Sequence, residues 1–118
     1  MNFLVKLLIS TLAVIITAYL LPGVTIENDS VLIAILVAAV LAFLNAIVKP
    51  IMVFLTIPFT LVTLGLFLLV INASIIMLAD KLVDGFSVRS FWSALFFSIV
   101  LSIVNSILSG VQRRDNSN

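Results

Sequence analysis

The sequence predicts an all-α integral membrane protein with four transmembrane helices. Hydrophobic residues make up 64% of the chain and charged residues 9%, whereas soluble domains hold about 45–50% and about 25%. The apolar residues are gathered in long runs, near the length of about 20 residues that a helix needs to cross a bilayer. Short polar loops separate these runs, so 118 residues form a single membrane domain, 1–118, with no room for a soluble one.

The first two spans follow from two such runs. The first run, residues 3–21, contains a lysine near its start, as a secretory signal does, but no small-x-small cleavage site precedes Pro22. We therefore expect a retained first helix. The second span, residues 31–48, is expected to end at Lys49 and Pro50, because a charge followed by a helix-breaking residue is typical of a membrane boundary.

The following apolar stretch, residues 51–79, is too long for one simple span. As a single helix it would be about 43 Å long at 1.5 Å per residue, against a hydrocarbon core of about 30 Å. Pro58 disfavours helix at the residue before it. We therefore expect a linker, 49–58, holding a short interfacial or re-entrant helix, and then a third span, 59–79. A single tilted and kinked helix is the alternative.

The fourth span covers residues 91–111 and precedes a polar tail, 112–118. Basic residues favour the cytoplasmic side of a membrane. With both termini in the cytoplasm, Lys81 and Arg89 lie outside, and the other four basic residues lie inside: Lys6, Lys49, Arg113 and Arg114. This count favours a cytoplasmic tail, although a difference of two charges leaves the opposite orientation open.

A row of small residues, four positions apart, occurs in both the second and the fourth span. A shift of 60 positions superimposes the two rows and also places Asn45 on Asn105. The rows are Ala34, Ala38, Ala42 and Ala46 in the second span, and Ala94, Ser98, Ser102 and Ser106 in the fourth.

The loops that precede these spans match as well. Residues 23–26, GVTI, correspond to residues 85–88, GFSV, at a shift of 62. The chain therefore resembles two helical hairpins of the same orientation, repeat 1 over 3–48 and repeat 2 over 59–111. The two loop segments are expected either to pair as short strands or to form separate turns.

Residues four apart share one face of a helix, and small side chains let another backbone approach closely. We therefore expect the two rows to be helix-packing faces on which the second and fourth spans cross, within one molecule or between copies. Asn45 and Asn105 are expected to hydrogen-bond near the cytoplasmic end of this contact. The alternative is a water-lined face, for which Ser98 and Ser102 supply hydroxyls, although a serine also bonds its own helix.

Side chains for catalysis are scarce. Cysteine and histidine are absent, which removes thiol and imidazole chemistry and the usual zinc ligands. The acidic residues Asp80 and Asp84 lie in the second outer loop, not within a span. Asn72, within the third span, is expected to form an interhelical hydrogen bond. The sequence predicts a non-enzyme with no catalytic, metal or cofactor site and no small-molecule substrate, and a net charge of +1 does not favour nucleic acid.

Two stretches carry a family resemblance: NAIVKPIMVFLTIPFTLVTLGLFLLVINA and DGFSVRSFWSAL. Together they resemble the four-span phage holin family, superfamily IV, along nearly the whole chain. The residues that carry the resemblance are Asn45, Lys49, Pro50, Leu55, Thr56, Pro58, Thr63, Leu64, Gly65, Asn72, Ala73, Gly85, Phe86, Val88 and Phe91. The resemblance implies a four-span protein of the bacterial inner membrane, in a family whose members are mostly uncharacterised, and it transfers no catalytic or binding residue.

Two functions stay open. Holins as a class oligomerise and permeabilise the inner membrane, so the resemblance implies a self-associating, membrane-permeabilising protein. The alternative is a non-conducting structural or partner-binding bundle that serves envelope homeostasis. The lipid bilayer is the expected partner in both cases. Further copies of the chain are expected for the permeabilising protein, whereas the repeat favours a monomeric unit for the non-conducting bundle. A transporter or channel ranks below both, because no ionisable side chain lies deep within a span.

Overall fold

The computed structural model describes residues 2–116 of the chain, with side chains over residues 2–111. The described chain is mostly helical, and its only sheet is a two-stranded ribbon. In chain order the elements are α1 (Phe3–Leu20), β1 (Val24–Ile26), η1 (Glu27–Asp29), α2 (Val31–Phe43), η2 (Leu44–Val48), α3 (Lys49–Leu55), α4 (Ile57–Val62), α5 (Phe67–Leu82), β2 (Phe86–Val88) and α6 (Phe91–Asn116).

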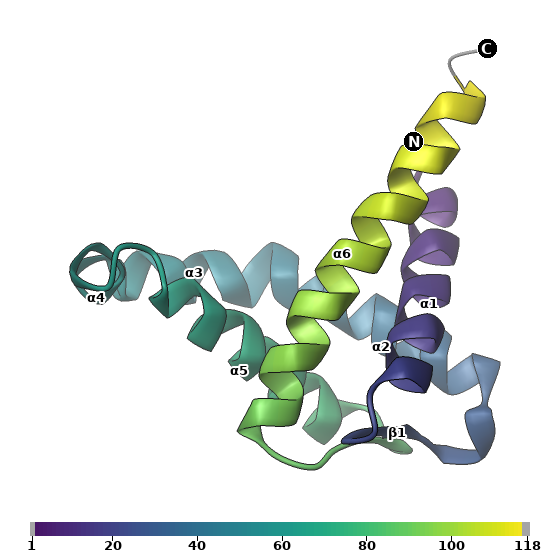
Figure 1. Ribbon diagram of the computed structural model, residues 1–118, viewed down its shortest axis with the longest axis horizontal. Helices are drawn as coiled ribbons and strands as arrows, with labels where there is room; N and C mark the ends of the chain where they lie inside the picture. The colour runs from purple at the N-terminus through teal and green to yellow at the C-terminus, as the bar shows by residue number, and fades with distance from the viewer. Residues whose placement is uncertain (1, 117–118) are drawn as a thin grey trace.

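The helices form a base and two arms (Figure 1). The base holds the ribbon, α2, the end of α5 and the adjoining parts of α1 and α6. The first arm is formed by the remaining lengths of α1 and α6, which run side by side. The second arm is formed by α3, α4 and the beginning of α5. Both α1 and α5 contact α2 and α6. The outcome is a V-shaped molecule.

The ribbon joins the loop before α2 to the loop before α6. Strands β1 and β2 pair antiparallel, with Thr25 opposite Ser87 at the centre. Beyond the strands, the Glu27 N–H donates to the Gly85 carbonyl at 2.7 Å and the Arg89 N–H donates to the Gly23 carbonyl at 2.8 Å. The expectation of paired strands is therefore confirmed, and the alternative of two separate turns is wrong.

Hydrogen bonds at the helix ends recur at the sequence shifts of 60 and 62. Ser30 caps α2 by accepting from the Ile33 N–H at 3.3 Å, and Ser90, 60 positions on, accepts from the Ser93 N–H at 3.3 Å at the start of α6. The Leu21 N–H donates to the Thr17 carbonyl, and the Val83 N–H, 62 positions on, donates to the Ala79 carbonyl. The loop before α2 and the loop before α6 thus contain the same local hydrogen bonds.

A small aromatic contact closes the base at the ribbon. Phe86 and Phe97 are 1% and 0% exposed, and their rings meet edge to face with centroids 5.6 Å apart. Such a contact contributes about 0.5–1.5 kcal/mol beyond its buried area. Ala34 and Ala94 are fully buried in the same core. The base is therefore dry and closed near the ribbon.

The helix of the second span does not end at Lys49 and Pro50, and the point where the span leaves the membrane stays a prediction. The helix continues through both residues, so that Val31–Leu55 forms one apolar helix of 25 residues. The π-helical turn η2 lies immediately before Pro50, which itself occupies the first turn of α3. A π-turn accommodates an irregularity in the hydrogen bonds of the helix backbone. A proline in the first turn of a helix lacks an N–H, but an N–H at that position has no acceptor within the helix. The proline is thereby accommodated without a break.

The third span also differs from its prediction. The helix expected over 59–79 is divided into α4 and α5, because Leu64 and Gly65 have φ angles of 57° and 91°. These left-handed conformations end α4, and the Gly65 N–H donates back to the Thr60 carbonyl at 2.8 Å. The preceding break falls at Thr56, and Pro58 lies in the first turn of α4. Residues 51–55 therefore continue the helix Val31–Leu55, and their interfacial or re-entrant placement stays a prediction.

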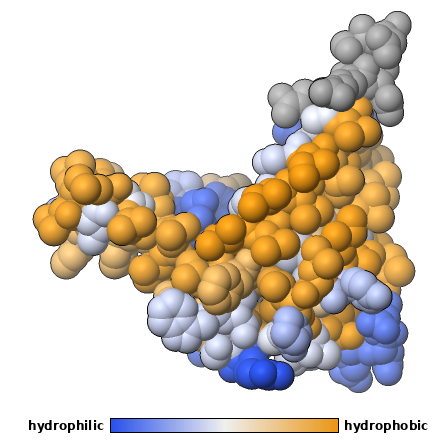
Figure 2. All heavy atoms as spheres, in the orientation of Figure 1, coloured by the Kyte–Doolittle hydropathy of each residue, from blue (hydrophilic) through white to orange (hydrophobic). Residues whose placement is uncertain are grey.

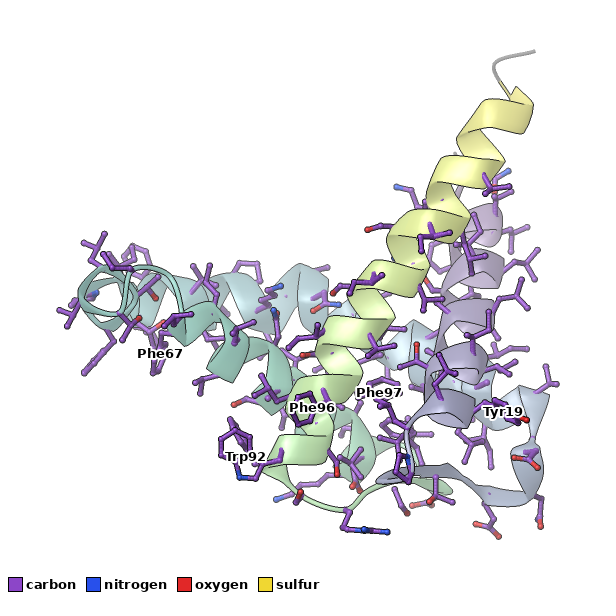
Figure 3. The ribbon with its side chains drawn as sticks, in the orientation of Figure 1. Tyr19, Phe67, Trp92, Phe96 and Phe97 are labelled. Carbon is purple, nitrogen blue, oxygen red and sulfur yellow. The ribbon has the colours of Figure 1, made fainter. Side chains whose placement is uncertain are left out.

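Three helices in the described chain are long and apolar enough to cross a membrane: Phe3–Leu20, Val31–Leu55 and Phe91–Val111. Helix α5 has 16 residues, about 24 Å, and is shorter. Hydrophobic atoms cover both arms, and hydrophilic atoms gather at the ribbon end (Figure 2). Tyr19 and Trp92 are 90% and 65% exposed near that end (Figure 3), as expected of aromatic side chains at a membrane interface.

Candidate functional site

Polar side chains of the helices gather in one cleft between the two arms. The cleft has a volume of about 150 Å³, which is room for several water molecules or for one phosphate group. Hydrophilic atoms are visible in the notch where the arms diverge (Figure 2). The lining residues come from α1, α2, α3, α5, α6 and η2: Ser10, Val14, Ala38, Leu41, Ala42, Asn45, Lys49, Asn72, Ile75, Ile76, Ser98, Leu101, Ser102 and Asn105.

The lining is composed mainly of pairs of residues related by the shifts of the two halves. Two pairs at a shift of 62 join α1 to α5, and four pairs at a shift of 60 join α2 and η2 to α6. The pairs are Ser10 and Asn72, Val14 and Ile76, Ala38 and Ser98, Leu41 and Leu101, Ala42 and Ser102, and Asn45 and Asn105. Lys49 and Ile75 line the cleft without a matching partner. The cleft therefore lies where the two halves of the chain meet.

Three asparagines face this cleft, and their hydrogen bonding is incomplete. The Asn105 Oδ1 atom is buried and accepts no hydrogen bond. Among the described residues, no hydrogen bond joins Asn105 to Asn45. The bond expected between the two asparagines is therefore absent here. A buried acceptor without a donor costs about 1–3 kcal/mol, so this oxygen is a ready site for an incoming donor.

Lys49 is half-buried and lies in the cleft, not at the end of a span. It stands six residues before the end of the long helix Val31–Leu55, about 9 Å along its axis. Among the described residues that line the cleft, Lys49 is the one basic residue and none is acidic. The cleft is therefore electropositive.

The serines of α6 behave in two ways. The Ser98 hydroxyl is buried and donates to the Leu95 carbonyl of its own helix at 2.8 Å, so it is satisfied locally. Ser102, one turn further along, is exposed in the cleft. Water can therefore reach the outer part of the cleft.

The small-residue rows are buried over their first halves and exposed over their second halves. Their first halves, Ala34 and Ala38 in α2 and Ala94 and Ser98 in α6, are buried in the base. Their second halves are exposed in the single chain: Ala42, Ala46, Ser102 and Ser106. The crossing of the second and fourth spans on these rows, within one molecule or between copies, stays a prediction.

The cleft is closed toward the ribbon. Ala38 and Ser98 are its deepest small residues, 2% and 6% exposed. One turn nearer the ribbon, Ala34 and Ala94 are 0% exposed, and Figure 3 shows Phe97 pointing into the same core. The cleft is therefore open between the arms and sealed at the base.

The residues of the family resemblance lie mostly at irregular points of the backbone. Gly65 and Gly85 have positive φ angles of 91° and 93°, and Phe86 is part of the seal. Near the end of α5, and not in a loop as the sequence indicated, the Asp80 carboxylate accepts from the Val88 N–H at 2.8 Å and so fastens α5 to the ribbon.

Ser10 was not recognised from the sequence as a site residue, although a signal for it exists. Applying the loop shift of 62 to the first span places Ser10 on Asn72, which marks both as polar positions of one cleft. Among the described residues, no group of three metal-ligating side chains comes together. The absence of a catalytic, metal or cofactor site stays a prediction.

The fold and the cleft define a small polytopic membrane protein built from apolar helices. The chain belongs to the family described as mycobacterial four-span phage holin, superfamily IV, whose profile matches residues 1–107. It is 40% identical over 116 residues to an uncharacterized protein of Streptomyces coelicolor, covering 92% of this chain and 93% of that protein. It is 38% identical over 85 residues to the uncharacterized membrane protein YvlD of Bacillus subtilis, covering 71% of each. No solved structure matches the chain.

Proposed function

We propose that this protein is a non-conducting bundle of the bacterial inner membrane that binds a polar group in the cleft between its arms. The observation that carries this proposal is the one-sided shape of the cleft. Its open part presents three asparagines and Lys49, while its inner end is closed by Ala34 and Ala94. A path that ends in a dry core holds a ligand and does not pass one. No enzymatic role is part of the proposal.

The proposed architecture is two hairpins of the same orientation, 3–48 and 59–111, joined by the linker 49–58. The repeated caps and loop bonds support this proposal, as does the paired lining of the cleft. The proposed fourth crossing is formed by α5, supported by the four-span description of the family. Both termini are proposed to lie in the cytoplasm, supported by the count of basic residues. The tail, 112–118, lies outside the described side chains.

A second candidate function is holin-type permeabilisation by an assembly of copies. The specific observation in its favour is the exposure of the second halves of the small-residue rows. Ala46 and Ser106 are exposed and do not line the cleft, so they are free to pack against another copy. In this candidate a homo-oligomer, and not the single chain, encloses the water-filled path.

One titration distinguishes the two functions. Purified protein is reconstituted into liposomes at increasing density, and release of dyes of graded size is measured. The non-conducting bundle predicts that even the smallest dye is retained at every density. Permeabilisation by assembly predicts release that rises steeply with density, because a pore forms only when several copies meet.

Two double variants extend the titration. Ala46→Leu with Ser106→Leu blocks close packing of the exposed rows and would abolish any release that depends on them. Ile47→Leu with Ile107→Leu is the control, since both residues are exposed, adjoin the rows and stay apolar. Density-dependent release that only the first double variant removes would contradict the non-conducting function.

A further inference from the structure

Lys49 lies in surroundings that a lone cation does not favour. The residues before it belong to η2 and the apolar helix α2, and large apolar side chains follow it in α3, with Ile51, Phe54 and Leu55 56%, 72% and 68% exposed. The positive charge is therefore flanked by hydrophobic surface on both sides. A charge in such a place needs an opposite charge or access to water, and the described lining of the cleft supplies no carboxylate.

The acidic residues with described side chains lie far along the chain from this position and near the ribbon. Glu27 and Asp29 form part of η1, and Asp80 and Asp84 adjoin β2. Asp80 is already engaged with the Val88 N–H. The complementary charge for Lys49 must then come from outside these residues, and an anion in the cleft fits that requirement.

The second feature of the cleft is its unpartnered acceptor. The buried Asn105 Oδ1 requires a hydrogen-bond donor, whereas Lys49 has three N–H donors and requires an anion. A ligand that satisfies both carries a negative charge and, a few bonds away, a hydroxyl or an ammonium group. The amides of Asn45 and Asn72 offer further donors to the anionic part.

We propose that the cleft binds the headgroup of a phospholipid, with the phosphate at Lys49 and a headgroup hydroxyl or ammonium donating to Asn105. The apolar arms on either side of the cleft are the reason for a lipid and not a free anion, because acyl chains can lie along their exposed surface (Figure 2). Phosphatidylglycerol and phosphatidylethanolamine meet both requirements. Phosphatidylcholine has the phosphate but no N–H or O–H to donate.

The test is native mass spectrometry of the detergent-purified full chain after incubation with each of these three lipids. We expect one retained phosphatidylglycerol or phosphatidylethanolamine per chain, and retention of phosphatidylcholine lower by about tenfold, since one hydrogen bond is missing. Lys49→Gln should lower retention of phosphatidylglycerol by about tenfold or more. Asn105→Asp, which keeps the size of the side chain and adds a negative charge, should lower it as well.

Lys6→Gln is the matched control, because Lys6 is an exposed lysine near the end of a span and does not line the cleft. Equal losses in the Lys6→Gln and Lys49→Gln variants would overturn the proposal, as would equal retention of the three lipids. Displacement of the bound lipid by millimolar inorganic phosphate would overturn the lipid as the occupant and assign the site to a soluble anion. Circular dichroism of each variant separates loss of binding from loss of fold.

This inference rests on the proposed function, because it names the polar group that the cleft takes. The lipid-binding inference and the non-conducting function can be contradicted separately. Dye release from liposomes would overturn the non-conducting function without affecting lipid retention, and loss of lipid selectivity would leave dye retention unchanged.

Discussion

Gly65 and Gly85 share a left-handed backbone but differ in their surroundings. Their φ angles are 91° and 93°, and a side chain in this region costs about 1–2 kcal/mol. A Cβ at position 65 would have open space, whereas a Cβ at position 85 would lie 2.6 Å from Ile33 Cδ1. Steric strain of the backbone acts at both positions, and crowding acts only at Gly85.

We therefore expect Gly85→Ala to destabilise the protein more than Gly65→Ala does. Both variants carry the backbone cost of about 1–2 kcal/mol, and Gly85→Ala adds a smaller cost, because the end of the Ile33 side chain must move aside. Thermal unfolding in detergent, followed by far-ultraviolet circular dichroism, measures the difference. Equal melting temperatures for the two variants would contradict the contact with Ile33.

At this scale the sequence is informative about residue type but not about surroundings. The two glycines and Lys49 were all singled out, and a glycine between a helix and a strand is a local signal of positive φ. Lys49 was assigned to a membrane boundary because lysine usually lies there. Its place in the cleft depends on α1, α5 and α6, which are distant in the sequence, so no local pattern reveals it.

At the scale of elements, the ribbon depends on one side chain from a helix. The Asp80 carboxylate accepts from the Val88 N–H at 2.8 Å, and this N–H loses that acceptor if the carboxylate is removed. Asp80→Ala should lower the free energy of unfolding by about 1–2 kcal/mol, since a part-buried donor is left unsatisfied. Asp84→Ala is the control, because Asp84 is exposed in the loop that follows α5.

Hydrogen exchange of the Val88 amide adds a local readout to the melting temperature. The amide should exchange faster in Asp80→Ala than in the Asp84→Ala control. If both variants exchanged and melted alike, the carboxylate would not be what fastens α5 to the ribbon.

The helices were predicted less accurately than the ribbon for a physical reason. Proline rules describe the backbone within one turn, and they correctly mark positions 50 and 58 as irregular. They do not say whether a π-turn absorbs the irregularity, as η2 does before Pro50, or whether the chain breaks, as it does at Thr56 and again at Leu64. The paired strands were one of the two predicted forms, because the GVTI and GFSV segments match each other and each has the residue pattern of a strand.

At the scale of the whole molecule, shifts of 60 and 62 align most residues that line the cleft. The small residues of the two rows are buried as far as Ala38 and Ser98, and whether the rows pack against each other stays a prediction. Beyond that turn the arms diverge and the polar residues are left facing each other across the cleft. Small-residue spacing predicts a possible close approach, and the remaining helices decide which approach is used.

The end of the second arm, formed by α4 and the turn before α5, presents an apolar surface whose place relative to the membrane can be tested. Its large side chains are exposed and apolar, with Phe59, Val62 and Leu64 62%, 84% and 92% exposed. The hydroxyl groups of Thr56, Thr60 and Thr63 donate hydrogen bonds to backbone carbonyls of their own turns, so these hydroxyls are satisfied without water. An apolar surface with internally bonded backbone is suited to lipid. We therefore expect this end of the arm to lie within the bilayer and not in the cytoplasm.

Single cysteines test this placement cleanly, because the chain has none of its own. Ser87→Cys on the ribbon should react with a charged maleimide in intact spheroplasts, and Asn2→Cys only after permeabilisation. Leu64→Cys should resist the charged maleimide in both conditions and react with an apolar, membrane-permeant one, because its thiol is surrounded by acyl chains. Prompt labelling of Leu64→Cys by the charged reagent after permeabilisation would instead place the turn before α5 in the cytoplasm. Labelling of Asn2→Cys in intact spheroplasts would reverse the proposed orientation.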